Sequence, residues 1–288
     1  MNITVQSKSM DIQQFWQQYH SSQRRFSHIR LPHAAFCGAN LSGLDFSYGH
    51  LPCADLIWVD ISGANLTGIN LQESVAIWLQ GLWTDFHWAD LRGMDLSCAN
   101  LQMADFTSAN LTRAKLAGAD ISGISAQDAC FKEANLWGIW APQADFSGAC
   151  LQSVDLSGGN LSGACLVEAE LGWSQLLKTV GARSNLTLVC LEGSDLSGAD
   201  FSFACLQRAN LSATNWQNAC LQSADLRGAD LRGADLQGAN LGNADLTDAD
   251  VTGADLRGAN LQGTVLFEDH CDMTSVAQSN SWGLGISG

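Results

Sequence analysis

The residues of this sequence that could do chemistry are mainly carboxylates and thiols, and both follow a fixed spacing of five residues. Eighteen of the 29 acidic residues are aspartates in one slot of that spacing. Six of the ten cysteines take the same slot: Cys130, Cys150, Cys165, Cys190, Cys205 and Cys220. Paired carboxylates act as general acid and base where a pocket shifts their pKa values apart, and clustered thiolates bind metal ions. A slot that recurs along the whole chain indicates a structural role first.

The sequence lacks the usual motifs of catalysis and of ligand binding. It has no C-x-x-C pair, no Ser-His-Asp spacing, no phosphate-binding loop and no dinucleotide fingerprint. His20, His28, His33 and His50 are scattered near the start of the chain, where histidines are usually solvated, and the His270-Cys271 pair is isolated. We therefore predict no catalytic residue, no metal site and no cofactor, and we expect that the protein is not an enzyme.

The charge balance narrows the class of partner. Fourteen basic and 29 acidic residues give a formal net charge of -15, so phosphates would be repelled and direct nucleic-acid binding is disfavoured. A protein with an electropositive surface is favoured as partner. The N-terminus has no apolar segment typical of a signal peptide, and no apolar run approaches the ~20 residues of a membrane span. We expect a cytoplasmic protein.

The elements that position these residues follow from an internal repeat. Every fifth residue from Phe26 to Leu266 forms a frame of 49 slots that never shifts, and 44 of them hold Leu, Phe, Ile, Val or Trp. Two positions earlier, 41 of 47 slots hold a small residue or Val. The slot between is Asp 18 times, Asn 12 times and Cys six times. The repeat is therefore Ala-(Asp/Asn/Cys)-Leu-x-x. We call its first position the small slot, its second the middle slot and its third the central slot.

A period of five matches neither a helix of 3.6 residues per turn nor a strand with a period of two. The chain must instead turn a corner every five residues, with the central and small slots inside and the other three positions facing water. Gly, Asn, Asp and Ser supply the corners. The run from Ala224 to Leu261 shows the pattern most clearly.

These residues resemble the pentapeptide-repeat family over about 240 of the 288 residues. The resemblance implies an all-β solenoid, a right-handed quadrilateral β-helix in which four repeats make one coil, here about 12 coils. We expect three segments: residues 1–22 with a short α-helical cap, the β-helix over 23–266, and a C-terminal cap or tail over 267–288. Ile12, Phe15, Trp16 and Tyr19 have the spacing of an amphipathic helix, with Asp11 and Gln14 as a capping box.

The repeat departs from its rule in four stretches, and such departures can mark function or strain. They are Ser74–Thr84, Ile124–Asp128, Trp137–Gln143 and Leu177–Ser184. Gly81, Ala141 and Gly181 replace large central residues, and with 20 residues per coil they fall on one face. Two interpretations remain open here. The stretches are tolerated irregularities of one wall, or they are protruding loops that touch a partner.

Outward aromatic and basic residues are the candidate contacts to a partner. Trp58, Trp78, Trp83 and Trp88 all lie two positions after a central slot, and Trp58 and Trp78 should stack on adjacent coils. Exposed aromatic residues mark interaction surfaces, although they could also pack under a loop or against the N-terminal helix. The full candidate set is Trp58, Trp78, Trp83, Trp88, Trp137, Trp140, Lys178 and Arg183.

The function predicted from these observations is a protein-binding scaffold or regulator that acts through the outer surface of a rigid β-helix. Its partner is a protein of unknown identity, and the chain itself is a monomer or a homodimer. The alternative rests on resemblance: the quinolone-resistance pentapeptide proteins imitate a DNA duplex and act on DNA gyrase, and rows of Asp could resemble phosphate rows. A third possibility is a purely structural spacer within a larger assembly.

Overall fold

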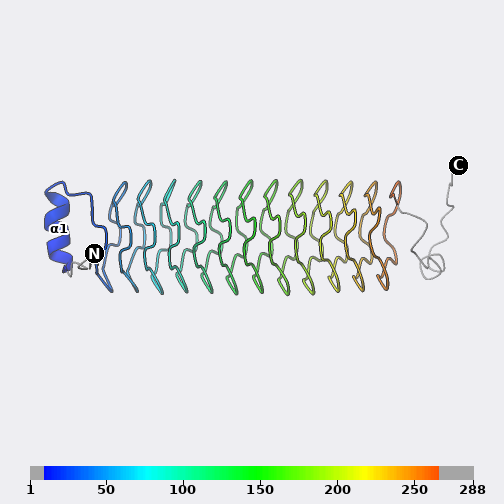
Figure 1. Ribbon diagram of the computed structural model, residues 1–288, viewed down its shortest axis with the longest axis horizontal. Coiled ribbons are helices and arrows are strands. Elements are labelled where there is room, and N and C mark those ends of the chain that lie inside the picture. Colours follow the sequence, from blue (N-terminus) through cyan, green and yellow to red (C-terminus); the bar gives the residue numbers. More distant parts are fainter. Residues whose placement is uncertain (1–9, 266–288) are drawn as a thin grey trace, which may run out of the picture.

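The structure, a computed structural model, describes residues 10–265. One α-helix, α1 (Ile12–His20), lies across the end of a straight stack of coils (Figure 1). Isolated parallel β-bridges join each middle-slot residue to the residue 20 positions later, from Arg25↔Asp45 to Asp245↔Val265. Four pentapeptides therefore complete one turn, and the chain forms a right-handed quadrilateral β-helix, as the resemblance to the pentapeptide-repeat family implies.

Every backbone N–H of a regular repeat has a partner, and residues 104–108 show how. The amides of Asp105, Phe106 and Ser108 donate to carbonyl oxygens of neighbouring coils at 2.9, 2.6 and 2.9 Å. The amide of Ala104 closes a turn on Leu101 at 3.1 Å. The fifth amide, that of Thr107, faces no carbonyl and donates to Oδ1 of Asp105 at 2.8 Å. A middle-slot Asp or Asn thus supplies the one acceptor that the backbone lacks.

The corners impose a second constraint, on backbone conformation. The residue two positions after each central slot has a positive φ at every turn from His28 to Gly263. Glycine fills 19 of these positions without steric cost, whereas the other 29 carry a side chain in a conformation that L-residues disfavour. The turn bond between the central carbonyl and the amide three residues later holds them there, as in Ala109 to Phe106 at 2.8 Å.

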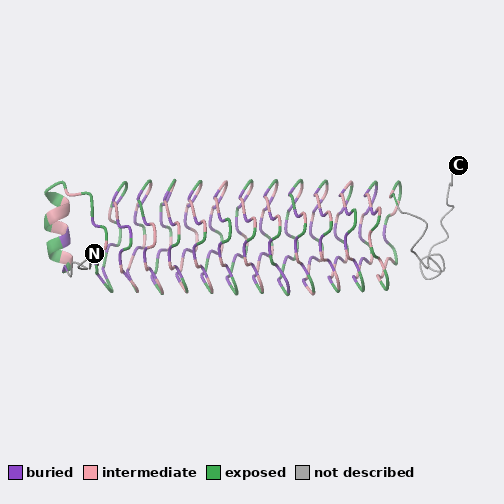
Figure 2. Cartoon of the chain, viewed as in Figure 1, coloured by how far each residue is buried: buried purple, intermediate pink, exposed green. Residues whose placement is uncertain are grey.

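The interior of the rod is mainly apolar, with a few buried Ser and Thr residues in small slots. Central residues such as Leu111 and small-slot residues such as Ala109 are at most 1% exposed, and Figure 2 shows buried segments alternating with exposed corners around each coil. Small residues bring opposite walls close, and large residues fill the remaining space. At Trp216, the largest residue in a central slot, the buried indole Nε1–H donates to Oγ1 of Thr214 at 2.9 Å.

The four irregular stretches keep the same backbone, so the hypothesis that they are protruding loops is wrong. The bridges Gln80↔Asn100, Trp140↔Asn160 and Val180↔Asp200 continue the ladder in step. In three cases the large and small residues have exchanged places, so that the volume inside the coil is conserved. These exchanged pairs are Leu79 with Gly81, Ile124 with Ala126, and Ile139 with Ala141. The interpretation as tolerated irregularity is the one that the backbone supports.

The space beside Gly181 is filled by a side chain of the next coil instead. The Phe201 ring lies over Gly181, so a Cβ atom added there would sit 2.6 Å from Cδ1 and 2.8 Å from Cζ of that ring. Leu101 fills the space beside Gly81 in the same way, with its Cδ2 at 2.8 Å. One coil can therefore omit a large side chain if its neighbour supplies one.

Helix α1 packs on the first coils through one face. Phe15 is fully buried, with ring centroids 4.6 Å from Phe26 and 5.1 Å from Phe36. Asp11 and Gln14 form the predicted capping box, and the Tyr19 hydroxyl donates to the carbonyl of Asn40 at 2.8 Å. The predicted C-terminal segment 267–288, including His270 and Cys271, lies outside the described residues.

Removal of the middle-slot acceptor should destabilise the coil locally. We expect Asp105→Ala to lower the free energy of unfolding by about 1 kcal/mol, because the amide of Thr107 loses its protein partner. The control is Asp105→Asn, which keeps Oδ1 and should change stability by less than half as much. Urea-unfolding midpoints followed by circular dichroism measure both. Equal losses in the two variants would show that the charge matters and the acceptor does not.

The pair Gly181 and Phe201 offers a test of volume exchange between coils. We expect Gly181→Leu alone to destabilise the protein by about 1–3 kcal/mol, because the new side chain overlaps the Phe201 ring. Combined with Phe201→Leu it should recover most of that loss, since both slots then carry the usual residue of the repeat. The measurement is again the unfolding midpoint, here for the two single variants and the double variant. Additive losses would contradict the volume exchange.

Candidate protein-interaction surface

The ladder sorts residues onto four walls and four corners according to their number. Wall A contains the middle-slot residue Asn40 and its equivalents at intervals of 20, and walls B, C and D contain Asp45, His50 and Asp55 in the same way. Each corner holds the two turn residues that connect one wall to the next, and the corner is named after those two walls. Trp58, between Asp55 on wall D and Asp60 on wall A, therefore lies on the D–A corner. Residues five apart lie on neighbouring walls or corners, and residues 20 apart lie side by side.

Exposed large hydrophobic residues gather on wall A and on the two corners that flank it. We call this surface the apolar side. It holds nine of the 15 such residues in the described part of the chain. They are Trp58, Trp78 and Leu177 with Trp137 on the D–A corner, Trp140 and Val180 on wall A, and Trp83, Met103 and Phe203 on the A–B corner.

Two contacts order side chains within the apolar side. Trp58 and Trp78 stack, as the sequence predicts, with ring centroids 5.4 Å apart and an interplanar angle of 8°. The Arg183 guanidinium lies 5.8 Å from the centre of the Phe203 ring, within reach of a cation–π interaction. Both contacts join residues 20 apart, so the stacking of coils creates them. Aromatic surface thus remains exposed, with 59% of Trp58 and 61% of Trp83 open to solvent.

The tryptophans of the corners are held at a conformational cost. Trp58, Trp78 and Trp83 have φ values of 59°, 62° and 58°, where a bulky residue is an outlier. Glycine fills the same turn position at many other corners and would remove this strain. A strained residue that leaves most of its surface in water gains little from packing, so the turn itself does not require tryptophan at these corners.

Charge separates the apolar side from the opposite side of the rod. Between residues 57 and 203 the apolar side carries five charged residues, and wall C with its two corners carries ten. The five are Asp60, Asp120, Lys178, Arg183 and Asp200. Lys178 and Arg183 form no ion pair with any residue of the described chain. The apolar side therefore joins aromatic surface to two uncompensated cations.

The structure brings together seven of the eight residues predicted from the sequence. Trp88 is the exception, because it lies on the B–C corner with Tyr48 and Leu188. Sequence reasoning missed four exposed hydrophobic residues, whose numbers, taken in steps of 20, place them on the same wall or corners as Trp83, Trp137 and Trp140: Met103, Leu177, Val180 and Phe203. That arithmetic was the signal that could have found them.

The middle-slot aspartates accept hydrogen bonds from backbone amides of the ladder and from nearby arginines. The Arg227 guanidinium donates to both carboxylate oxygens of Asp225, at 2.8 and 2.6 Å, and this lowers the pKa of Asp225. Arg232 lowers the pKa of Asp230 in the same way. Such pairs keep the carboxylates ionised at neutral pH, which suits a structural acceptor and does not suit a general acid.

The thiols and imidazoles do not gather into a metal site within residues 10–265. Cys130 and Cys150 are neighbours on wall C, and the nine cysteines of the described chain are free. Burial raises the pKa of the Cys150 thiol, and the adjacent Cys130 raises it further. A raised pKa disfavours the thiolate that nucleophilic or metal-binding chemistry needs.

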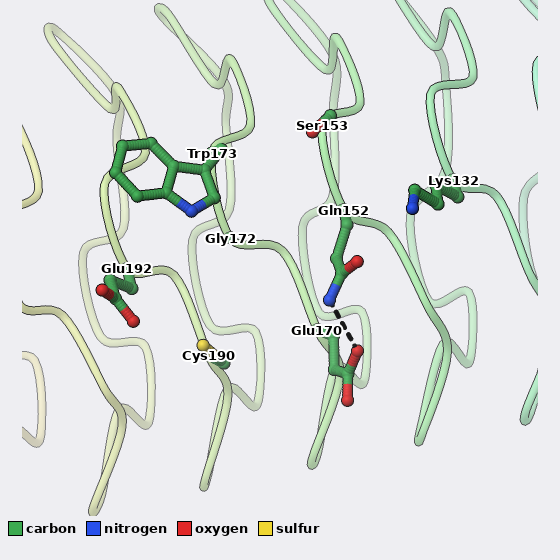
Figure 3. A pocket seen from close by; sticks show the side chains of 8 residues that line it. All are labelled: Lys132, Gln152, Ser153, Glu170, Gly172, Trp173, Cys190 and Glu192. Atoms are coloured by element: carbon green, nitrogen blue, oxygen red, sulfur yellow. Dashed lines mark hydrogen bonds between the residues drawn. The ribbon is translucent and has the colours of Figure 1, made fainter.

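A shallow hollow lies on wall C and the C–D corner of the described rod (Figure 3). Its volume is about 420 Å³, and its lining includes Glu170, Gly172, Trp173 and Glu192. It lies on the side of the rod opposite to the apolar side. Within the described residues, no helix has the length and apolar character needed to span a membrane.

Comparison with solved structures gives relatives of the same repeat type. HetL, a pentapeptide repeat protein involved in heterocyst differentiation regulation in the cyanobacterium Nostoc sp. strain PCC 7120, is 30% identical, with 88% of this chain and 98% of HetL covered and a TM-score of 0.40. Rfr23 from the cyanobacterium Cyanothece 51142 is 43% identical over 31% of this chain and 60% of its own, with a TM-score of 0.31.

QnrB1, a plasmid-mediated fluoroquinolone resistance protein, is 22% identical, with 76% of this chain and 94% of QnrB1 covered and a TM-score of 0.21. Among curated proteins, none matches the sequence significantly. The family profile described as Pentapeptide repeats matches in eight copies, over residues 84–123, 129–166, 164–202, 204–243 and 224–263. These matches span more than half of the chain, and together with the 20-residue ladder they show that the protein belongs to the pentapeptide-repeat family.

Proposed function

We propose that the protein is a non-enzymatic scaffold or regulator that binds another protein through its apolar side. The observation that carries this proposal is the gathering of nine exposed hydrophobic residues on wall A and its flanking corners. Exposed apolar patches of this kind are typical of protein interaction sites, and Trp and Arg are the residues most enriched at binding hot spots.

The rigid backbone supports the same proposal. About 12 coils, joined by the bridges between residues 25 and 265, form a rod that α1 caps at its N-terminal end. The apolar side needs no folding step before it binds, so little conformational entropy is lost on association. Lys178 and Arg183 favour acidic groups at the edge of the partner's surface. A cytoplasmic location fits free thiols.

DNA mimicry has less support from the arrangement of charges. Along any one wall of the described rod, at most two aspartates follow each other before another residue type interrupts the column. Near the C-terminal end, Arg227, Arg232 and Arg257 pair with Asp225, Asp230 and Asp255 at 2.6, 2.6 and 2.5 Å. Such interrupted and partly neutralised columns are a poor copy of a continuous phosphate row.

The test compares two sets of substitutions that differ in their position around the rod. Trp58→Ala, Trp78→Ala and Trp83→Ala together remove three of the six aromatic residues exposed on the apolar side. The matched control carries Tyr48→Ala, Trp88→Ala and Leu188→Ala, all on the B–C corner. Proteins captured from an extract of the native host by the wild-type rod are then quantified by mass spectrometry.

We expect at least one captured protein to fall about tenfold or more with the first set and to be retained with the control set. The circular-dichroism spectra of both variants should match the wild type, because the substituted side chains are exposed. Equal recovery with the two variants would refute a role for the apolar side. A gyrase supercoiling assay addresses the alternative, which requires inhibition of the enzyme or its protection from a quinolone.

A further inference from the structure

A recurring side-chain clasp covers the surface between successive coils. In this clasp a Gln directly after a central slot donates its amide to the carboxylate 18 residues later. Gln127 reaches Asp145 at 2.6 Å, Gln152 reaches Glu170 at 2.9 Å, and Gln207 reaches Asp225 at 2.6 Å. The Gln side chain lies along the wall and fills the space between coils.

The clasp is absent one coil after Gln152, where the hollow lies, as it is at other coils of this wall such as Lys132 with Cys150. Gly172 stands in the Gln position, and Cys190 stands where the carboxylate should be. Gly172 has no side chain to lie along the wall, and both residues line the hollow of about 420 Å³ (Figure 3). A Cβ atom added to Gly172 would find its nearest neighbour, the carbonyl oxygen of Glu192, at 3.6 Å. The backbone therefore has room for a larger residue, and the glycine is not required by the fold.

Trp173 forms the aromatic border of the hollow. It sits on the C–D corner and its indole lies against Gly193 on the next coil, where a Cβ atom would come within 2.7 Å of Cε3 and Cζ3. Gly193 thus lets the ring lie down along the surface, while 68% of Trp173 stays exposed. Neither an aromatic ring nor a cation lies within interaction distance of this indole in the described chain.

Two glutamates line the hollow together with the indole. Glu170 uses Oε2 to accept from Gln152, which leaves Oε1 without a partner, and Glu192 has no side-chain hydrogen bond or ion pair in the described chain. Figure 3 shows Glu192 below the indole and Glu170 across the hollow from Cys190. Lys132 lines the far end, beyond Gln152, and forms no ion pair with either glutamate. The charge of the lining is therefore negative.

We propose that this hollow binds a cationic side chain of a partner protein, specifically the guanidinium group of an arginine. A planar guanidinium stacks on an indole face through cation–π attraction, and its N–H groups donate to carboxylates at the rim. The exposed indole supplies the face and Glu192, below it, supplies the acceptor, while Glu170 adds negative charge across the hollow. The site is distinct from the apolar side, so it adds a specific contact on the opposite surface of the rod.

The experiment uses N-acetyl-arginine amide as the probe, with N-acetyl-citrulline amide as its neutral isostere and N-acetyl-lysine amide as the second cation. Binding to the full chain is followed by NMR through the indole N–H of Trp173 and the backbone amides of Gly172 and Gly193. We expect saturable shifts at millimolar arginine probe, a weaker response to the lysine probe and none to citrulline. Trp88, exposed on the neighbouring B–C corner beside the paired Asp90 and Arg92, serves as the internal reference.

Three variants separate this site from general attraction to an acidic protein. Trp173→Ala should abolish the shifts at Gly172 and Gly193, and Glu192→Gln should weaken binding about fivefold. The double variant Gly172→Gln/Cys190→Asp rebuilds the clasp, closes the hollow and should abolish binding while the unfolding midpoint stays the same or rises. Equal shifts with citrulline, equal shifts at Trp88, or undiminished binding by the clasp variant would each overturn the proposal.

Discussion

The backbone hydrogen bonds between neighbouring coils are the interactions on which this fold depends, and where the middle slot is Asp or Asn its side chain completes them by accepting from the amide after the central residue. Four of the five amides of a repeat such as 104–108 find backbone carbonyls, and the fifth has Oδ1 of Asp105. With that acceptor in place, a chain of five-residue segments can bend at every corner and leave no amide without a partner. The abundance of Asp and Asn in this protein is thus a consequence of backbone geometry.

The same constraint explains why the core tolerates so much variation. Because the ladder fixes the backbone, the interior of a coil must be filled by side chains of the right total volume. Those side chains can come from different slots. Ile139 with Ala141 conserves volume within one repeat, and Phe201 over Gly181 conserves it between coils. Irregular sequence here marks repacking of the interior. The outward residues of the same stretches, such as Trp140 and Val180, are exposed and do not pack in the core. Repacking of the interior therefore does not explain them.

Because the interior is closed, a partner can contact only the side chains of the walls and corners. These side chains differ in chemistry from one side of the rod to the other. The apolar side displays aromatic surface with few charges, whereas wall C displays carboxylates, Arg–Asp pairs and the hollow beside Trp173. A straight rod presents both surfaces over many coils at once, and its stacked coils keep their spacing fixed. A partner that extends along the rod, or two partners on opposite sides, would suit this division.

The sequence by itself determined that the chain turns a corner every five residues with its large residues inside, because the frame from Phe26 to Leu266 never shifts. Its resemblance to the pentapeptide-repeat family supplied the coil of four repeats, and the sequence also determined the capping box at Asp11 and the stacking of Trp58 on Trp78. The tertiary structure decided which exposed residues share a surface. Trp83 and Trp88 are close in the chain but lie on different corners, since each repeat turns the chain onto the next wall, while Trp83 and Phe203 share a corner across six coils. It also decided that the irregular stretches are not loops, and that a hollow lies where the clasp is absent at Gly172 and Cys190. Those outcomes depend on contacts between residues 18 to 20 positions apart, which form when neighbouring coils stack.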